Sequence, residues 1–132
     1  MLASEVSEHR SSLVEDSTSA ITDRLPTAMN VEVGDSRRPR AERFSRILLD
    51  APCSGLGALR RRPEARWVKT PESIPALREL QEALLRNGLN SLAPGGYLAY
   101  VTCSPVVEET TAVINRVVSD DERLTLLDTP SV

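Results

Sequence analysis

The chain has 132 residues, of which 40% are hydrophobic and 27% are charged, and its net charge is −3. This length allows one domain at most, and the composition excludes an intrinsically disordered chain. The acidic balance excludes a general attraction to nucleic acids. No apolar run reaches the roughly 18 residues that span a bilayer, and Met1–Arg10 lacks the apolar centre of a signal peptide. We therefore expect a cytoplasmic protein with reduced cysteines and no membrane partner.

The first third of the chain predicts two short strands around one helix. The strands cover Leu2–Val6 and Met29–Val33, and a helix with a loose apolar face runs over His9–Leu25 until Pro26 ends it. The polar stretch Ser36–Arg43 follows and predicts a loop.

A buried strand is predicted at Arg46–Asp50. Its apolar residues are continuous rather than alternating, which is typical of a parallel strand covered on both faces. Pro52 and the glycines after it predict a turn. The segment Arg60–Val68 predicts an ordered loop.

The longest predicted helix covers about Pro71 to Leu92 and is stopped by Pro94-Gly95-Gly96. Its expected buried face recurs every three or four residues: Ile74, Leu77, Leu80, Leu84, Gly88 and Leu92. A strand at Tyr97–Val101 comes next. A helix is then predicted over Pro105–Val118, with Glu108 and Glu109 near its positive end, followed by a short strand at Arg123–Leu127.

This order of elements predicts an α/β fold with a parallel sheet covered on both faces. Open sheets of this kind bind ligands at the carboxyl ends of their strands. Four polar side chains follow predicted strands and would line one such edge: Glu5, Asp35, Asp50 and Cys103. Carboxylates there could bind the ribose hydroxyls and adenine amino group of a nucleotide-like ligand. Taken singly, each acid is more often a turn or capping residue.

The two cysteines, Cys53 and Cys103, indicate nucleophilic chemistry. They are 50 positions apart, and each follows a predicted strand. The positive end of the helix predicted from Pro105 should favour the Cys103 thiolate, which could add to an electron-poor ring carbon. The alternative is a buried cysteine that packs as a small apolar residue. A metal site is not expected, because the chain has one histidine and no Cys-x-x-Cys.

Arginines form two clusters that could hold phosphates. The first cluster, which a solvated loop explains better, is Arg37, Arg38, Arg40, Arg43 and Arg46. The second cluster, which adjoins Cys53 and favours a phosphate contact at least as well as a loop, is Arg60, Arg61, Arg62 and Arg66. Trp67 could stack on a base, although a core or loop-anchoring position is the more common use of a single tryptophan.

Three motifs together carry a family resemblance. They are Leu49-Asp50-Ala51-Pro52-Cys53-Ser54-Gly55-Leu56-Gly57, then Arg60-Arg61-Arg62-Pro63 with Trp67, and Thr102-Cys103-Ser104-Pro105. They closely resemble the RNA cytosine-C5 methyltransferases of the Sun family, especially the bacterial RsmB (Fmu) branch that modifies small-subunit ribosomal RNA. The resemblance runs from about Ala3 to Ile114, and the Asp-Ala-Pro-Cys block followed by Thr-Cys-Ser is highly specific.

The resemblance implies a Rossmann-like methyltransferase that uses S-adenosylmethionine and acts on RNA, with 16S ribosomal RNA as the expected substrate. By this resemblance, Cys103 attacks C6 of the target cytosine and forms a covalent intermediate. Cys53 assists removal of the C5 proton and release of the product. Asp50 faces the reaction centre, where it lies near the cofactor and hydrogen-bonds the cytosine ring.

The resemblance also implies binding residues. Glu5 matches the acid at the cofactor ribose, and Asp35 matches the acid near the adenine. Arg60 and Arg61 would contact RNA phosphates.

The chain also departs from the family pattern. Four parts of that pattern find no match in it: the first strand, the glycine-rich cofactor loop after it, the N-terminal RNA-binding domain and the last antiparallel strand. We therefore expect residues 1–132 to form a partial methyltransferase catalytic domain with an incomplete sheet, unable to methylate alone. The alternatives are a catalytically dead fragment that binds RNA or a partner, and a thiol-redox protein with the two sulfurs within bonding reach.

Overall fold

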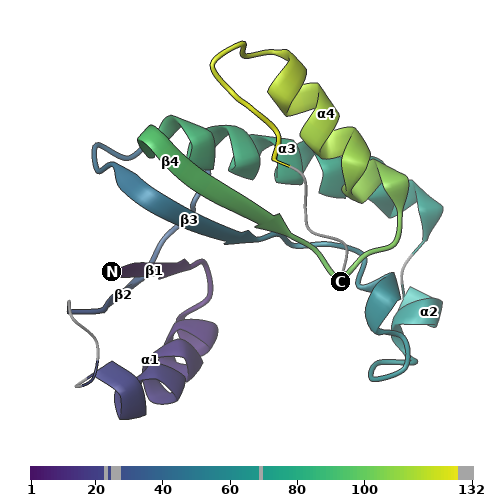
Figure 1. Cartoon of the computed structure of the whole chain (residues 1–132). Helices are drawn as coiled ribbons and strands as arrows, with labels where there is room; N and C mark the ends of the chain where they lie inside the picture. Colours follow the sequence, from purple (N-terminus) through teal and green to yellow (C-terminus); the bar gives the residue numbers. More distant parts are fainter. Residues whose placement is uncertain (23, 25–27, 69, 128–132) are drawn as a thin grey trace. The chain divides into compact units, whose positions relative to one another are not determined.

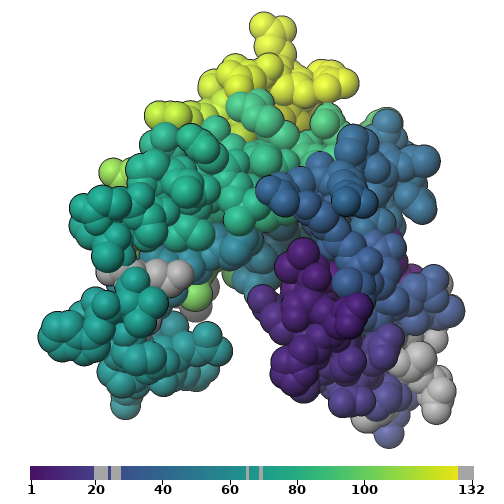
Figure 2. All heavy atoms as spheres, turned by 180° about the vertical axis from the view of Figure 1, so that it is seen from behind, coloured from purple at the N-terminus to yellow at the C-terminus, as the bar shows by residue number. Residues whose placement is uncertain are grey.

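The computed structural model describes residues 1–22, 24, 28–68 and 70–127. The chain forms two compact units, Met1–Arg40 (unit 1) and Ala41–Val132 (unit 2). Figure 1 draws them as ribbons and Figure 2 as heavy atoms, with unit 1 in purple and blue. Each unit contains one pair of parallel strands together with helices. The predicted α/β class is confirmed.

Unit 1 is a β–α–β arrangement. Strands β1 (Leu2–Glu5) and β2 (Asn30–Val33) pair in parallel. Helix α1 (Glu8–Thr22) connects them and packs against both (Figure 1). These elements confirm the three predictions for this region, while the predicted helix end at Leu25 and Pro26 lies outside the described residues.

Unit 2 consists of a two-stranded parallel sheet with two helices on one face (Figure 1). The strands are β3 (Phe44–Asp50) and β4 (Leu92–Val101), and the helices are α3 (Ile74–Asn90) and α4 (Thr111–Ser119). The core between sheet and helices consists of Leu85, Val113 and Val117, against which Leu49, Leu89, Leu98 and Tyr100 pack. This packing brings the carboxyl ends of β3 and β4 together at one edge.

Within unit 2, the described residues leave the opposite face of this sheet open. Successive side chains of a strand point to opposite faces, so Leu49 packs on the helices while Leu48 is 73% exposed. On the open face, the Arg46 guanidinium stacks over the Tyr97 ring at 4.3 Å from its centroid. The prediction that Arg46–Asp50 is covered on both faces is therefore wrong for the described residues, because the apolar side chains of α3 and α4 reach only one face.

The long helix differs from its prediction in length and in its buried face. It follows a 3₁₀ turn, η2 (Pro71–Ser73), and ends at Asn90, so that the predicted stop Pro94-Gly95-Gly96 lies within β4 instead. Gly95 has φ +72° there, and the register of β4 against β3 shifts at this end of the sheet. The fully buried residues of α3 are Gln81 and Leu85, neither of which was in the predicted face.

Three further predictions need correction. The segment Arg60–Val68 contains a short helix, α2 (Ala65–Val68). The segment predicted as a helix from Pro105 forms a loop and a 3₁₀ turn, η3 (Val107–Glu109), before α4 begins. Arg123–Leu127 begins in a turn and continues without regular secondary structure, rather than as a strand. Among the described helices, none is long and apolar enough to cross a membrane.

Candidate active site

The two cysteines lie side by side beyond the ends of β3 and β4. Backbone hydrogen bonds join the loops that carry them: the Ala51 N–H donates to the Val101 carbonyl (2.9 Å), and the Gly57 N–H donates to the Cys103 carbonyl (2.8 Å). The sulfur atoms of Cys53 and Cys103 are 3.3 Å apart, and both thiols are free. Parallel pairing of the two strands thus brings together residues that are 50 positions apart.

The loop that carries Cys53 needs glycine at two positions, for two different reasons. Gly55 has φ +73°, in the left-handed region that glycine adopts without strain. At Gly57 the constraint is space, because a β-carbon there would lie 2.5 Å from the Cys103 carbonyl oxygen. The close approach of the two cysteine loops therefore requires glycine at position 57.

The carboxylate of Glu109 connects the two cysteine loops by hydrogen bonds. Its Oε1 accepts hydrogen bonds from the Ser54 N–H (2.8 Å) and the Gln81 amide (3.1 Å), and its Oε2 accepts from the hydroxyls of Ser54 and Ser104 (2.6 Å each). The Gln81 amide also donates to the Pro52 carbonyl at 2.8 Å. Glu109 and Gln81 are both 0% exposed. Ser54 and Ser104 directly follow the cysteines, so this network supports both loops.

Glu109 is charged despite its burial. Burial raises the pKa of its carboxyl, but the hydroxyls of Ser104 and Ser54, the Ser54 N–H and the Gln81 amide favour the charged form more strongly. The net pKa lies below the ordinary value of 4.5. A carboxylate is an acceptor only, which matches the donors that converge on it.

The two thiols differ in acidity. Burial raises the pKa of Cys53, but hydrogen bonds from the Thr102 hydroxyl, the Cys103 thiol and the Gly55 backbone outweigh burial and lower this pKa below 9.0. The pKa of Cys103 is raised, first by its hydrogen bond to Cys53, then by burial and by the negative charges of Cys53 and Asp50. The thiolate is therefore favoured at Cys53, with Cys103 as the proton donor.

The prediction that a helix end favours the Cys103 thiolate is wrong. Helix α4 begins at Thr111, and a loop and the turn η3 separate it from Cys103. The field of a helix end falls off within its first turn. The first cause acting on the Cys103 thiol is instead its hydrogen bond with Cys53, which raises the pKa.

The other residues predicted near the cysteines are on the surface of unit 2. Asp50 is exposed at the end of β3, near enough to Cys103 for its charge to raise that pKa. Arg60 and Arg61 are exposed in the turn after the 3₁₀ turn η1 (Leu56–Ala58). Trp67 is 83% exposed on α2, so the core interpretation of this residue is wrong.

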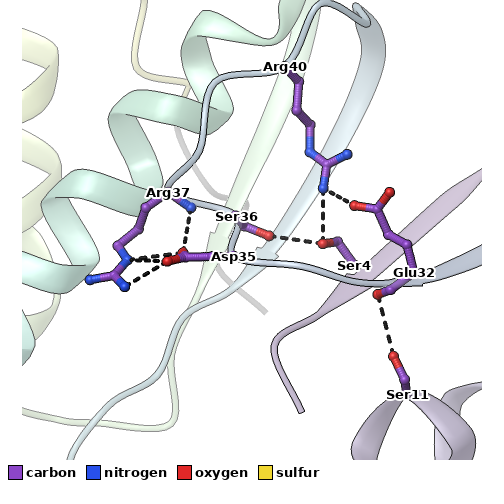
Figure 3. Close-up of polar contacts among 7 residues, drawn as sticks. All are labelled: Ser4, Ser11, Glu32, Asp35, Ser36, Arg37 and Arg40. Atoms are coloured by element: carbon purple, nitrogen blue, oxygen red, sulfur yellow. Dashed lines mark hydrogen bonds and ion pairs between the residues drawn. The ribbon is translucent and has the colours of Figure 1, made fainter. Parts of the chain in front are cut away.

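In unit 1, both predicted acids are engaged by their sequence neighbours. Glu5 accepts hydrogen bonds from the next two backbone N–H groups (2.9 and 3.3 Å) and pairs with Arg10 (3.3 Å). Asp35 binds the Arg37 guanidinium (2.6 Å) and backbone N–H (2.9 Å), as Figure 3 shows. These contacts lower the pKa of Asp35 to about 2.

Arg40 stabilises the strand ends of unit 1 (Figure 3). Its guanidinium forms an ion pair with Glu32 and donates to the Ser4 hydroxyl (3.1 Å), which also contacts the Ser36 hydroxyl (3.2 Å). The hydrogen bond from Arg40 lowers the pKa of Glu32. Arg37 and Arg40 therefore act within the protein. The solvated-loop interpretation of the first arginine cluster is wrong for Arg46, which lies in β3 and stacks on Tyr97.

Comparison with known proteins identifies the family. A family model described as 16S rRNA methyltransferase RsmB/F matches residues 1–132. The chain belongs to the RsmB/F methyltransferase family. The resemblance inferred from the cysteine and arginine motifs is thereby confirmed.

The RsmB/F chain is similar to parts of longer proteins. It is 40% identical over 119 residues to the ribosomal RNA small subunit methyltransferase B of Salmonella arizonae, covering 87% of the chain and 27% of that protein. It is 43% identical over 112 residues to a Mycobacterium tuberculosis protein named as a methyltransferase, covering 85% and 23%. The chain thus spans about a quarter of the length of the curated relatives it matches.

A solved structure shares the fold of the RsmB/F chain. NSun6 from Pyrococcus horikoshii, determined with the compound SFG, superposes with a TM-score of 0.78 at 25% identity. The match covers 98% of the chain and 34% of NSun6. The α/β arrangement of parallel strands is therefore that of a methyltransferase.

Sequence reasoning on this RsmB/F chain missed the network around Glu109. Glu109 was attributed to a helix end, while Gln81, Ser54 and Ser104 received no function. Two signals could have indicated them: a glutamine among the apolar positions of a long helix, and a serine directly after each cysteine. Among the described residues, no cluster of three or more His, Cys, Asp or Glu side chains is placed to hold a metal ion.

Proposed function

We propose that residues 1–132 are part of the catalytic domain of a cytoplasmic RNA cytosine-C5 methyltransferase that acts on 16S ribosomal RNA through a covalent cysteine–cytosine intermediate. One observation carries the proposal: two free sulfurs, those of Cys53 and Cys103, lie 3.3 Å apart at the ends of adjacent parallel strands. A single pyrimidine ring placed there can be reached by both sulfurs. Asp50, at the end of β3, adds a carboxylate at the same edge.

The nucleophile in this proposal is Cys103, the more exposed thiol. Its sulfur adds to C6 of the cytosine, and its proton passes to solvent. The C5=C6 electron pair then makes C5 nucleophilic, and C5 takes the methyl group. Asp50 accepts a hydrogen bond from the ring and orients it.

The second half of the reaction regenerates the enzyme. The thiolate of Cys53, whose pKa is lowered, assists removal of the C5 proton. The C5–H electrons re-form the double bond, and the bond between Cys103 and C6 breaks to give the Cys103 thiolate. Product release therefore depends on Cys53, whereas formation of the covalent bond depends on Cys103.

S-adenosylmethionine would supply the methyl group from a positively charged sulfur. Two carboxylates of unit 1 fit its nucleoside part, because Glu5 and Asp35 lie at the carboxyl ends of paired parallel strands, where such sheets bind nucleotides. Their partners, Arg10 and Arg37, are more than half exposed and can give way to a ligand. The structure of NSun6 with SFG, an S-adenosylmethionine analogue, supports the use of this cofactor.

Arg60 and Arg61 would bind the RNA backbone. Replacing either arginine by alanine should weaken RNA binding at low salt and reduce the salt slope of log K by about one. Arg123→Ala is the matched control, because Arg123 is an exposed arginine that pairs with Asp121. Filter binding over a salt series measures the effect, and an equal loss in all three variants would contradict the assignment.

The catalytic assignment is tested by trapping with RNA that contains 5-fluorocytosine, whose C5 substituent cannot leave as a proton. Because the chain spans only part of its relatives, residues 1–132 replace the matched segment of the Salmonella arizonae protein. We expect a covalent adduct that is retained in Cys53→Ala and lost in Cys103→Ala. A folded chimera that binds RNA without an adduct would instead support a catalytically dead binding fragment. An adduct that requires Cys53 would reverse the two roles.

A further inference from the structure

Glu109 is placed to act on the cysteines through the residues that follow them. Its carboxylate bonds to Ser54, directly after Cys53, and to Ser104, directly after Cys103. We propose that Glu109 is a positioning residue, which fixes the distance between the two cysteine loops and thereby the spacing of the two thiols. Its relevance to methyl transfer rests on the proposed function, whereas the spacing itself can be measured without that reaction.

The geometry of the carboxylate supports this role. One oxygen atom, Oε2, accepts hydrogen bonds of 2.6 Å from both serine hydroxyls, which are themselves 3.1 Å apart. A hydroxyl has one proton to donate, so each serine is oriented towards the same atom. Each serine is the next residue after a cysteine, and neighbouring α-carbons are only about 3.8 Å apart. Fixing the two serines on one oxygen atom therefore also restricts the distance between Cys53 and Cys103.

The carboxylate is itself held in place. Oε1 accepts from the Gln81 amide of α3, and the Tyr100 hydroxyl of β4 donates to the Glu109 carbonyl at 2.9 Å. The side chains of Glu109 and Gln81 are fully buried, so water does not replace these partners. Helix α3 and strand β4 therefore hold Glu109 in place, and Glu109 in turn holds the two cysteine loops.

A packing role alone does not explain these contacts. An apolar residue of similar size could fill the space, but it would leave the Ser54 N–H and two serine hydroxyls without their acceptor. A glutamine would present an amide donor to groups that are already donors. The site needs a charged acceptor, and Glu109→Gln removes that property with little change of volume.

The spacing of the sulfurs is measured with a thiol–disulfide equilibrium in the intact chain. Two protein thiols and one oxidised glutathione give one protein disulfide and two reduced glutathione molecules, so sulfur, protons and electrons balance. The equilibrium constant reports how closely Cys53 and Cys103 are held in the folded protein. Loss of stability alone does not change it when the measurement is made on folded molecules, as verified by circular dichroism.

We expect Glu109→Gln to lower this equilibrium constant about tenfold, because buried donors lose a charged acceptor. Glu108→Gln is the matched control, since Glu108 is the exposed neighbour in the same turn, and it should leave the constant unchanged. Ser54→Ala and Ser104→Ala each remove one connection and should give smaller decreases. These two variants decide the question if Glu109→Gln does not fold.

The proposal is overturned if the folded Glu109 and serine variants all stay within about twofold of the wild-type constant, a difference too small for a lost charged hydrogen bond. This outcome is independent of the trapping experiment. A chimera that forms no adduct would contradict the proposed reaction without affecting the glutathione result. Unchanged glutathione constants would contradict the role of Glu109 without affecting the trapping result.

Discussion

The two units hold their carboxylates in opposite ways. In unit 2, Glu109 is fully buried, and every hydrogen bond it accepts comes from a group that is fixed by secondary structure or by a cysteine loop. In unit 1, Asp35 is bound by Arg37, an exposed side chain two positions along the chain. The buried Glu109 carboxylate is suited to fixing a geometry, whereas the half-buried Asp35 carboxylate can exchange its exposed arginine for a ligand.

The positions of the aromatic residues allow the unfolding of unit 2 to be followed separately. The chain has one Trp, two Tyr and one Phe, and all lie in unit 2: Phe44, Trp67, Tyr97 and Tyr100. Near-ultraviolet circular dichroism therefore reports on the packing of unit 2. Far-ultraviolet signal reports on the helices of both units.

The largest difference in stability between variants of the two units should come from neutralising one carboxylate in each. Glu109→Gln is expected to lower the free energy of unfolding of unit 2 by about 3 kcal/mol, because several buried donors lose their acceptor. Asp35→Asn should leave the near-ultraviolet transition unchanged, since Asp35 is on the surface of unit 1. Urea unfolding measures both variants. Equal midpoints would show that the buried network does not stabilise unit 2.

A second prediction separates the two glycines of the Cys53 loop. Gly57→Ala should destabilise unit 2 by about 2 kcal/mol, because the new methyl group meets the Cys103 carbonyl. Gly55→Ala should cost about 1 kcal/mol through its left-handed backbone alone. Gly57→Ala should also weaken disulfide formation with glutathione, whereas Gly55→Ala should not. The reverse order in the glutathione assay would contradict the close approach of the loops.

Secondary structure was predictable from the sequence where it depends on residues that are close together in the chain. The strands at Leu2–Glu5 and Asn30–Val33 and the helix between them followed from apolar spacing and from glycine and proline. The segment after Pro105 was not predictable in this way, because Glu109 is drawn into a network with Ser54, which is 55 positions away. Glu109 lies at the end of η3, and α4 begins only at Thr111.

The candidate site shows the same limit. Neighbouring strand ends were enough to expect Cys53 and Cys103 in one region. The acidity of each thiol was not predictable, because it depends on the 3.3 Å contact between the sulfurs and on Thr102, rather than on a helix end. Likewise, Gln81 on an otherwise apolar face makes sense only once its contacts with Pro52 and Glu109 are known.

A smaller effect should appear in the acid range. The folded pKa of Glu109 lies below its ordinary 4.5, so its stabilisation is present above that pH and is lost as the pH falls through the folded value. The near-ultraviolet transition of unit 2 should therefore weaken below pH 4.5, and Glu109→Gln should flatten this dependence. Glu108→Gln serves as the control and should retain the wild-type profile. An unchanged profile in Glu109→Gln would assign the acid sensitivity to other groups.

The claim that Cys53 and Cys103 form one coupled site is tested most directly by the pH dependence of alkylation with iodoacetamide at each cysteine of the intact chain, followed by mass spectrometry. The account predicts that Cys53 titrates below the ordinary thiol pKa of 9.0 and Cys103 above it. In Cys53→Ser, which removes the neighbouring thiolate, the pKa of Cys103 should fall towards 9.0. Two cysteines that titrate together at the ordinary value, with Cys103 unaffected by Cys53→Ser, would contradict it.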